Sequence, residues 1–193
     1  MSNGPSGDDV DAAVAEMVRV LRPHVSADWT VPAGSLEWTC WTTAAHVAHD
    51  LLAYAGQVAA RPTTRYLPFD LVIAADASPG DVLDVVGACG TLLRRAIATA
   101  APTDRGWHWG ACDPTGFAAM GVAETVLHTY DITRGLDVGW SPPASLSAAV
   151  LGRLFPDAPP GDPVRVLLWS TGRGDLDGRP RVASWTWKAA VAP

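Results

Sequence analysis

Apolar residues recur at the three- and four-residue spacing of an α-helix over the first third of the chain. One such stretch covers residues 8–22 and stops at Pro23. Its apolar positions are Val10, Ala13, Val14, Met17 and Leu21. A second stretch follows Thr39, a residue type that caps helices, and continues until Pro62. Because proline lacks the N–H that a helix interior needs, we expect two helices within these limits.

Two more stretches of helical spacing occupy the middle of the chain. The third has Ser78 as its N-cap and a proline in its first turn, and it extends to Pro102. The fourth covers residues 115–134 and ends at Gly135. Its apolar residues are distributed over every side, and such a helix must lie against several neighbours. The four stretches together predict a four-helix bundle.

The remainder of the chain has shorter and more varied patterns. Residues 141–156 predict a shorter fifth helix, residues 162–172 predict one more helical segment, and residues 181–189 alternate as a strand would. We therefore expect a mainly α protein in which residues 1–140 form the bundle. Residues 141–193 would form a short mixed α/β C-terminal extension, packed on the bundle.

The composition indicates the cellular compartment of the protein and argues against some classes of partner. Of 193 residues, 48% are hydrophobic and 18% are charged, which is typical of a globular domain. The net charge of −6 argues against nucleic-acid and membrane partners. The polar N-terminus and the lack of an apolar run of about 20 residues favour a cytoplasmic protein. A bundle of this size can be either a monomer or a homodimer. Cys40, Cys89 and Cys112 form no CxxC pair, so we expect reduced thiols that serve mainly in packing.

One polar stripe interrupts the apolar fourth helix. Glu124, His128 and Asp131 are separated by four and three residues, which places all three on one face. A buried carboxylate without a partner costs several kcal/mol, on the order of the usual penalty for an unpaired charge. A divalent metal would neutralise that charge, since Glu and His one helical turn apart can reach the same ion.

A third ligand has to come from another helix. The second helix offers His46 and His49 on neighbouring turns, and two histidines with one glutamate make the ligand count of a catalytic zinc site. The alternative is a hydrogen-bonded core pair without metal, because Glu-x3-His often occurs by chance. Asp131 would either orient the imidazole of His128 or pair with Arg134.

Two segments resemble a known family. Residues 36–55, LEWTCWTTAAHVAHDLLAYA, are similar to the Trp-Thr-x5-Ala-His segment of DinB-like bundles. Residues 116–136, GFAAMGVAETVLHTYDITRGL, resemble the Glu-x3-His-x2-Asp segment of the mycothiol-dependent maleylpyruvate isomerase branch. The resemblance covers roughly residues 8–140, and residues 167–187 are more weakly similar to the tail of related actinobacterial proteins.

The resemblance implies a DinB-like four-helix bundle with a metal site. By that resemblance the metal ligands are His46, Glu124 and His128, with His46 preferred over His49 because it follows Trp38 at the matching distance. Zinc is the usual metal of the family, and nickel, iron or manganese accept the same ligands. The family also implies mycothiol as cosubstrate.

These residues suggest three functions. The first is a metal-dependent, mycothiol-dependent S-transferase or isomerase that acts on a small electrophile, with Asp131 tuning His128 and with Trp107, Trp109 and Phe117 as candidate walls of the acceptor pocket. The second is a thiol-independent metal enzyme that hydrolyses or rearranges a small molecule. The third is a noncatalytic ligand-binding or regulatory bundle.

Overall fold

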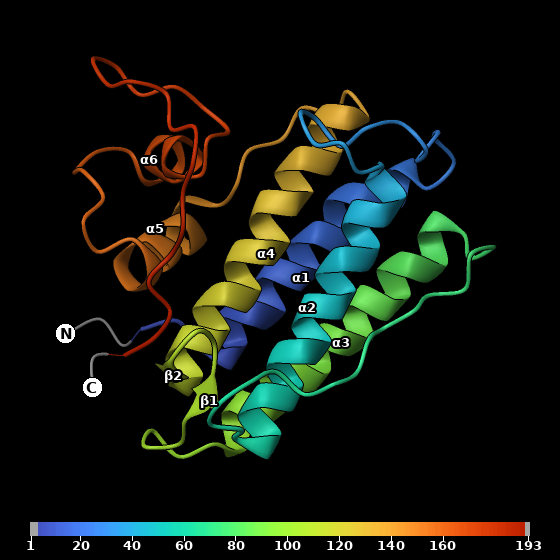
Figure 1. The fold of residues 1–193 in the computed structure, drawn as a ribbon. Helices are drawn as coiled ribbons and strands as arrows, with labels where there is room; N and C mark the ends of the chain where they lie inside the picture. The colour runs from blue at the N-terminus through green and yellow to red at the C-terminus, as the bar shows by residue number, and fades with distance from the viewer. Residues whose placement is uncertain (1–3, 192–193) are drawn as a thin grey trace.

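A computed structural model describes residues 4–191, and within that range the protein has six α-helices and one two-stranded sheet. Four long helices lie side by side, and two shorter helices follow them (Figure 1). The helices are α1 (Gly7–Leu21), α2 (Cys40–Ala60), α3 (Pro79–Thr99), α4 (Pro114–Gly135), α5 (Ala144–Leu154) and α6 (Pro163–Ser170). The predicted mainly α fold is confirmed. No helix in the described range has both the length and the apolar character needed to cross a membrane.

Local capping contacts explain where the long helices begin. The Ser6 hydroxyl accepts from the Asp9 N–H while the Asp9 carboxylate accepts from the Ser6 N–H, and Ser78 and Asp81 repeat this reciprocal pair at α3. The Thr39 hydroxyl accepts from the backbone at the start of α2. Each contact satisfies an N–H that has no partner within the helix. The starts predicted at Thr39 and Ser78 are therefore confirmed.

Helix α4 is the central element of the bundle. It packs against α1, α2, α3 and α5, and almost all of its residues are buried. This arrangement agrees with the apolar residues that the sequence distributes over all of its sides. Polar side chains on α4 therefore lie inside the protein, where they need partners.

Gly135 is the last residue of α4, and the loop before α2 comes very close to it. A Cβ atom at Gly135 would lie 2.4 Å from the carbonyl oxygen of Pro32 and 2.8 Å from Cys40 Sγ. The predicted end of the helix at Gly135 is confirmed, although the backbone reaches the left-handed region only at Asp137, with a φ of 55°. The glycine therefore serves close packing.

The strand predicted at residues 181–189 is wrong, because this tail has no regular secondary structure. It runs beside α5, where the Lys188 N–H donates to the Leu154 carbonyl at 2.9 Å, and the Val191 N–H donates to the Ala111 carbonyl at 2.8 Å. Alternation of side chains does not supply a neighbouring strand to pair with. The sheet of the described range is instead an antiparallel hairpin before α4, formed by β1 (Gly106–Trp107) and β2 (Ala111–Cys112).

Candidate metal centre

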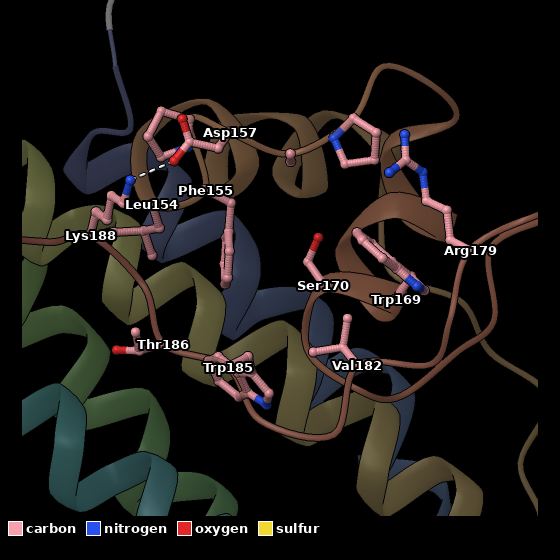
Figure 2. Close-up of a pocket in the computed structure, with 13 residues that line it drawn as sticks. Leu154, Phe155, Asp157, Trp169, Ser170, Arg179, Val182, Trp185, Thr186 and Lys188 are labelled. Atoms are coloured by element: carbon pink, nitrogen blue, oxygen red, sulfur yellow. Dashed lines mark hydrogen bonds and ion pairs between the residues drawn. The ribbon is translucent and has the colours of Figure 1, made fainter.

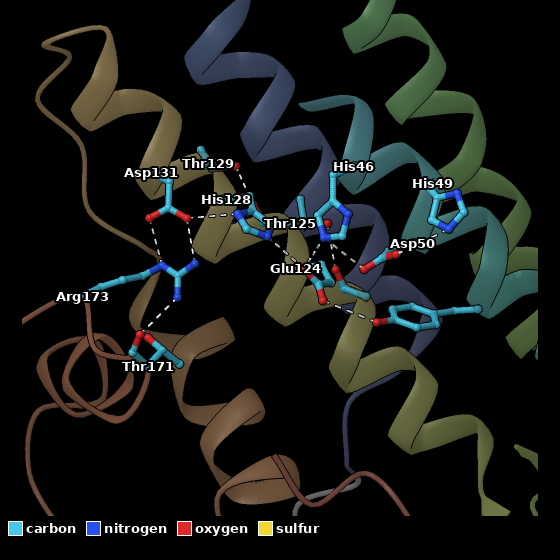
Figure 3. A network of polar contacts seen from close by, with 12 residues as sticks. His46, His49, Asp50, Glu124, Thr125, His128, Thr129, Asp131, Thr171 and Arg173 are labelled. Carbon is cyan, nitrogen blue, oxygen red and sulfur yellow. Dashed lines mark hydrogen bonds and ion pairs between the residues drawn. The ribbon is translucent and has the colours of Figure 1, made fainter. Parts of the chain in front are cut away.

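The structure brings His46, Glu124 and His128 together. Glu124 and His128 are one turn apart on α4, and His46 faces them from α2 (Figure 3). Glu124 Oε2 lies 3.2 Å from His128 Nε2 and 3.7 Å from His46 Nε2. One donor atom from each residue lies within 4.8 Å of the other two. The contact between α2 and α4 thus turns two distant sequence motifs into one cluster.

These three side chains fit a divalent cation. A tetrahedral zinc ion with ligands at about 2.0–2.1 Å separates neighbouring donor atoms by about 3.3 Å. The two distances to Glu124 Oε2, 3.2 and 3.7 Å, bracket that separation. Two imidazoles and one carboxylate also leave coordination positions open for water or a substrate.

Asp131 orients the imidazole of His128. Its Oδ2 lies 3.0 Å from His128 Nδ1, so Nδ1 donates to the carboxylate and Nε2 faces Glu124. Such a carboxylate partner fixes the tautomer and the ring direction of a ligand histidine. The other partner of Asp131 is Arg173, not Arg134, with Nε 2.9 Å from Oδ1 and Nη2 2.7 Å from Oδ2 (Figure 3).

Glu124 and His128 are buried, while His46 is partly exposed. Burial disfavours the charged form of Glu124, but hydrogen bonds with His128 and His46 hold its pKa well below the usual range. Burial also opposes protonation of His128, yet Asp131 and Glu124 raise the pKa of that imidazole to about 9. Burial, followed by the charge of Glu124, raises the pKa of Asp50 to about 7. The carboxylates therefore strongly favour a positive charge at this point.

The other polar residues of α2 lie around the cluster. Asp50 Oδ2 is 3.3 Å from His46 Nε2, the same ring nitrogen that faces Glu124, so this carboxylate lies beside the converging donor atoms. His49 Nδ1 lies 2.9 Å from the exposed Asp70, and His49 Nε2 lies 4.0 Å from Asp50 Oδ1. His49 is therefore outside the group of converging donors.

A cavity of about 450 Å³ opens beside Glu124. Trp109 lines it, as the sequence suggested, but Trp107 does not, and Phe117 is fully buried in the core. Its other lining residues include Tyr66, His108 and Trp187, none of which was assigned to this cavity from the sequence. The aromatic spacing in residues 107–109 and 185–187 is a sequence signal for such a wall, but it does not show that the two segments meet.

A second hollow of about 270 Å³ lies between α5, α6 and the tail (Figure 2). Phe155, Trp169 and Trp185 line it, and none of the residues of the His–Glu cluster does. Thr186 lines both this hollow and the cavity beside Glu124. The tail therefore forms a partition between the two.

The comparison with protein families identifies the bundle. The family model described as the mycothiol maleylpyruvate isomerase N-terminal domain matches residues 10–133. This range runs from α1 into α4 and includes the three residues of the cluster and Asp131. No curated protein and no solved structure matches the chain. A match over more than half of the sequence shows that the chain belongs to the mycothiol maleylpyruvate isomerase N-terminal domain family.

Proposed function

We propose that the protein is a metal-dependent and mycothiol-dependent S-transferase or isomerase that acts on a small electrophilic substrate. One observation carries this proposal: two histidines and a glutamate converge in the interior of a chain from a mycothiol-associated enzyme family. The donor types suit zinc first and also admit nickel, iron or manganese.

Each residue of the cluster has a definite part in the proposal. His46, Glu124 and His128 would hold the cation, and Asp131 keeps Nε2 of His128 directed at it. The Tyr54 hydroxyl donates to Glu124 Oε1 at 3.4 Å and restrains the carboxylate. A divalent cation bound there would supply the positive charge that favours the thiolate form of a thiol at neutral pH.

The nucleophilic thiol of this reaction comes from a small molecule, since the cysteines of the chain are unsuited to the role. Cys40 and Cys112 are fully buried, and burial raises their pKa to about 11 and about 12. A buried neutral thiol is a poor nucleophile at neutral pH. The cavity of about 450 Å³ beside Glu124 has the volume of a typical small-molecule site, which is about 300–1,000 Å³.

Elemental analysis of purified variants tests the metal. We expect close to one equivalent in the wild type and in His49→Ala, which changes a histidine next to the cluster but outside it. Glu124→Ala and His128→Ala should lose the metal. Unchanged metal content in both variants would remove the proposed site.

Turnover tests the thiol. We expect mycothiol to raise the melting temperature of the metal-loaded protein, because a ligand that binds only the folded state stabilises it. We also expect mycothiol-dependent conversion of a conjugated carbonyl or chloronitroaromatic electrophile. Metal-dependent turnover without thiol would favour hydrolysis or rearrangement instead, and binding without turnover would favour a regulatory bundle.

A further inference from the structure

His108 is held between two aromatic residues from distant parts of the chain. It lies in the turn between β1 and β2, while Tyr66 comes from the loop after α2 and Trp187 from the C-terminal tail. The Trp187 Nε1–H donates to His108 Nε2 at 3.2 Å, and the Tyr66 hydroxyl is hydrogen-bonded to His108 Nδ1. All three residues line the cavity beside Glu124.

These contacts determine where the imidazole proton lies. An indole N–H is only a donor, so Nε2 of His108 must act as the acceptor. A neutral imidazole has one acceptor nitrogen and one N–H, and the proton must therefore be on Nδ1. Burial lowers the pKa of His108 to about 4, which keeps the ring neutral at physiological pH. His108 Nδ1–H consequently donates to the oxygen of Tyr66.

The same reasoning leaves the hydroxyl proton of Tyr66 free. Tyr66 accepts from His108, and within residues 4–191 His108 is the one hydrogen-bond partner of this hydroxyl. Burial, and then the nearby charge of Asp50, raises the pKa of Tyr66, so the hydroxyl stays protonated. The other tyrosine of the cavity, Tyr54, already donates to Glu124.

We propose that Tyr66 is the hydrogen-bond donor of the cavity to an oxygen atom of the acceptor substrate, a carbonyl or carboxylate oxygen, and that His108 and Trp187 are positioning residues that keep it a donor. This inference rests on the proposed function for the identity of the cavity as the acceptor site. A donor aimed at such an oxygen stabilises negative charge that develops there when a nucleophile adds to the substrate.

NMR of the imidazole nitrogens tests the tautomer in the full-length protein. We expect His108 to carry its proton on Nδ1 at neutral pH, and Trp187→Phe to release Nε2 and populate the other tautomer. Trp185→Phe is the matched control, because Trp185 lies in the same tail but faces the hollow between α5 and α6. A wild-type His108 protonated on Nε2, or on both nitrogens, would overturn the proposal. A tautomer unchanged in Trp187→Phe would remove the role given to Trp187.

Infrared spectroscopy of bound acetophenone tests the donor. A hydrogen bond lowers the frequency of the carbonyl stretch, so we expect a higher frequency in Tyr66→Phe and a dissociation constant about three- to tenfold larger, the range for one neutral hydrogen bond. Trp187→Phe should shift the band in the same direction although Tyr66 is retained. Trp185→Phe should leave the band unchanged.

Two outcomes of the infrared experiment refute the proposal. One is a wild-type protein that does not bind acetophenone, and the other is a carbonyl band that is the same in the wild type and Tyr66→Phe. Neither result depends on turnover or on a thiol, so failure of the donor is distinguishable from failure of the proposed reaction. The latter is reported separately by metal content and by mycothiol-dependent conversion.

Discussion

Removal of the Arg173 guanidinium should destabilise the protein more than the loss of a surface charge does. Only 10% of the Arg173 side chain and 4% of the Asp131 side chain are exposed, and two nitrogen–oxygen contacts of 2.9 and 2.7 Å join them. Two unit charges about 4 Å apart attract by about 4 kcal/mol at an effective dielectric constant of about 20. Breaking a buried pair by removal of one partner typically costs about 3–5 kcal/mol.

The variant Arg173→Met retains an unbranched side chain of similar length and removes the charge. We expect a loss near the lower end of the range, about 3 kcal/mol, because His128 remains beside Asp131. For a protein of this size the loss corresponds to a fall of about 6–12 °C in melting temperature. Urea unfolding gives the change in free energy, and an unchanged m-value would show that the unfolding transition remains the same.

The matched control is Arg165→Met. Arg165 pairs with Asp177 at 3.0 Å, but 53% and 91% of the two side chains are exposed, so solvent screens the pair and its loss should be small. In the double variant that combines Arg173→Met with Asp131→Asn, the loss of free energy of unfolding should be smaller than the sum of the two single losses. The reasoning is refuted if Arg173→Met costs no more than Arg165→Met.

Three further predictions concern packing, pH and thiols. Gly135→Ala should destabilise the protein by about 1–3 kcal/mol, measured by urea unfolding, because the new methyl group meets the Pro32 carbonyl. Burial lowers the pKa of His108 from 6.5 to about 4, so this residue contributes stability that is present above pH 6.5 and lost as the pH falls towards 4. The free energy of unfolding of His108→Gln should therefore vary less between pH 6.5 and pH 4 than that of the wild type. The three buried cysteines should resist an aromatic disulfide reagent until the protein unfolds, and rapid labelling of the native state would contradict their burial.

The helices were predictable because the signals that define them are local. The caps at Thr39 and Ser78 act within three residues, and the helical spacing of apolar residues reports which face is buried. The stripe on α4 is equally local, since Glu124 and His128 are one turn apart in any helix. The choice of His46 from α2 needed the family resemblance, because spacing alone left His49 open.

The contacts made by the C-terminal residues were not predictable in the same way. Arg173 is 42 residues from Asp131, and no periodicity distinguishes it from Arg134, which is only three residues away. In the tail, alternation indicated a strand, but a strand requires a partner with free backbone groups. The tail instead uses the indole of Trp187 to contact His108.

Two residues that follow the range matched by the family model contact the candidate site from different sides. Arg173 holds Asp131, and through it His128, while Trp187 holds His108 at the wall of the cavity. A fragment that ends at residue 140 would leave the Asp131 carboxylate without Arg173 and would open the cavity at Trp187. We therefore propose that the extension and the bundle form one functional unit, and that the smallest active form of the protein includes the tail.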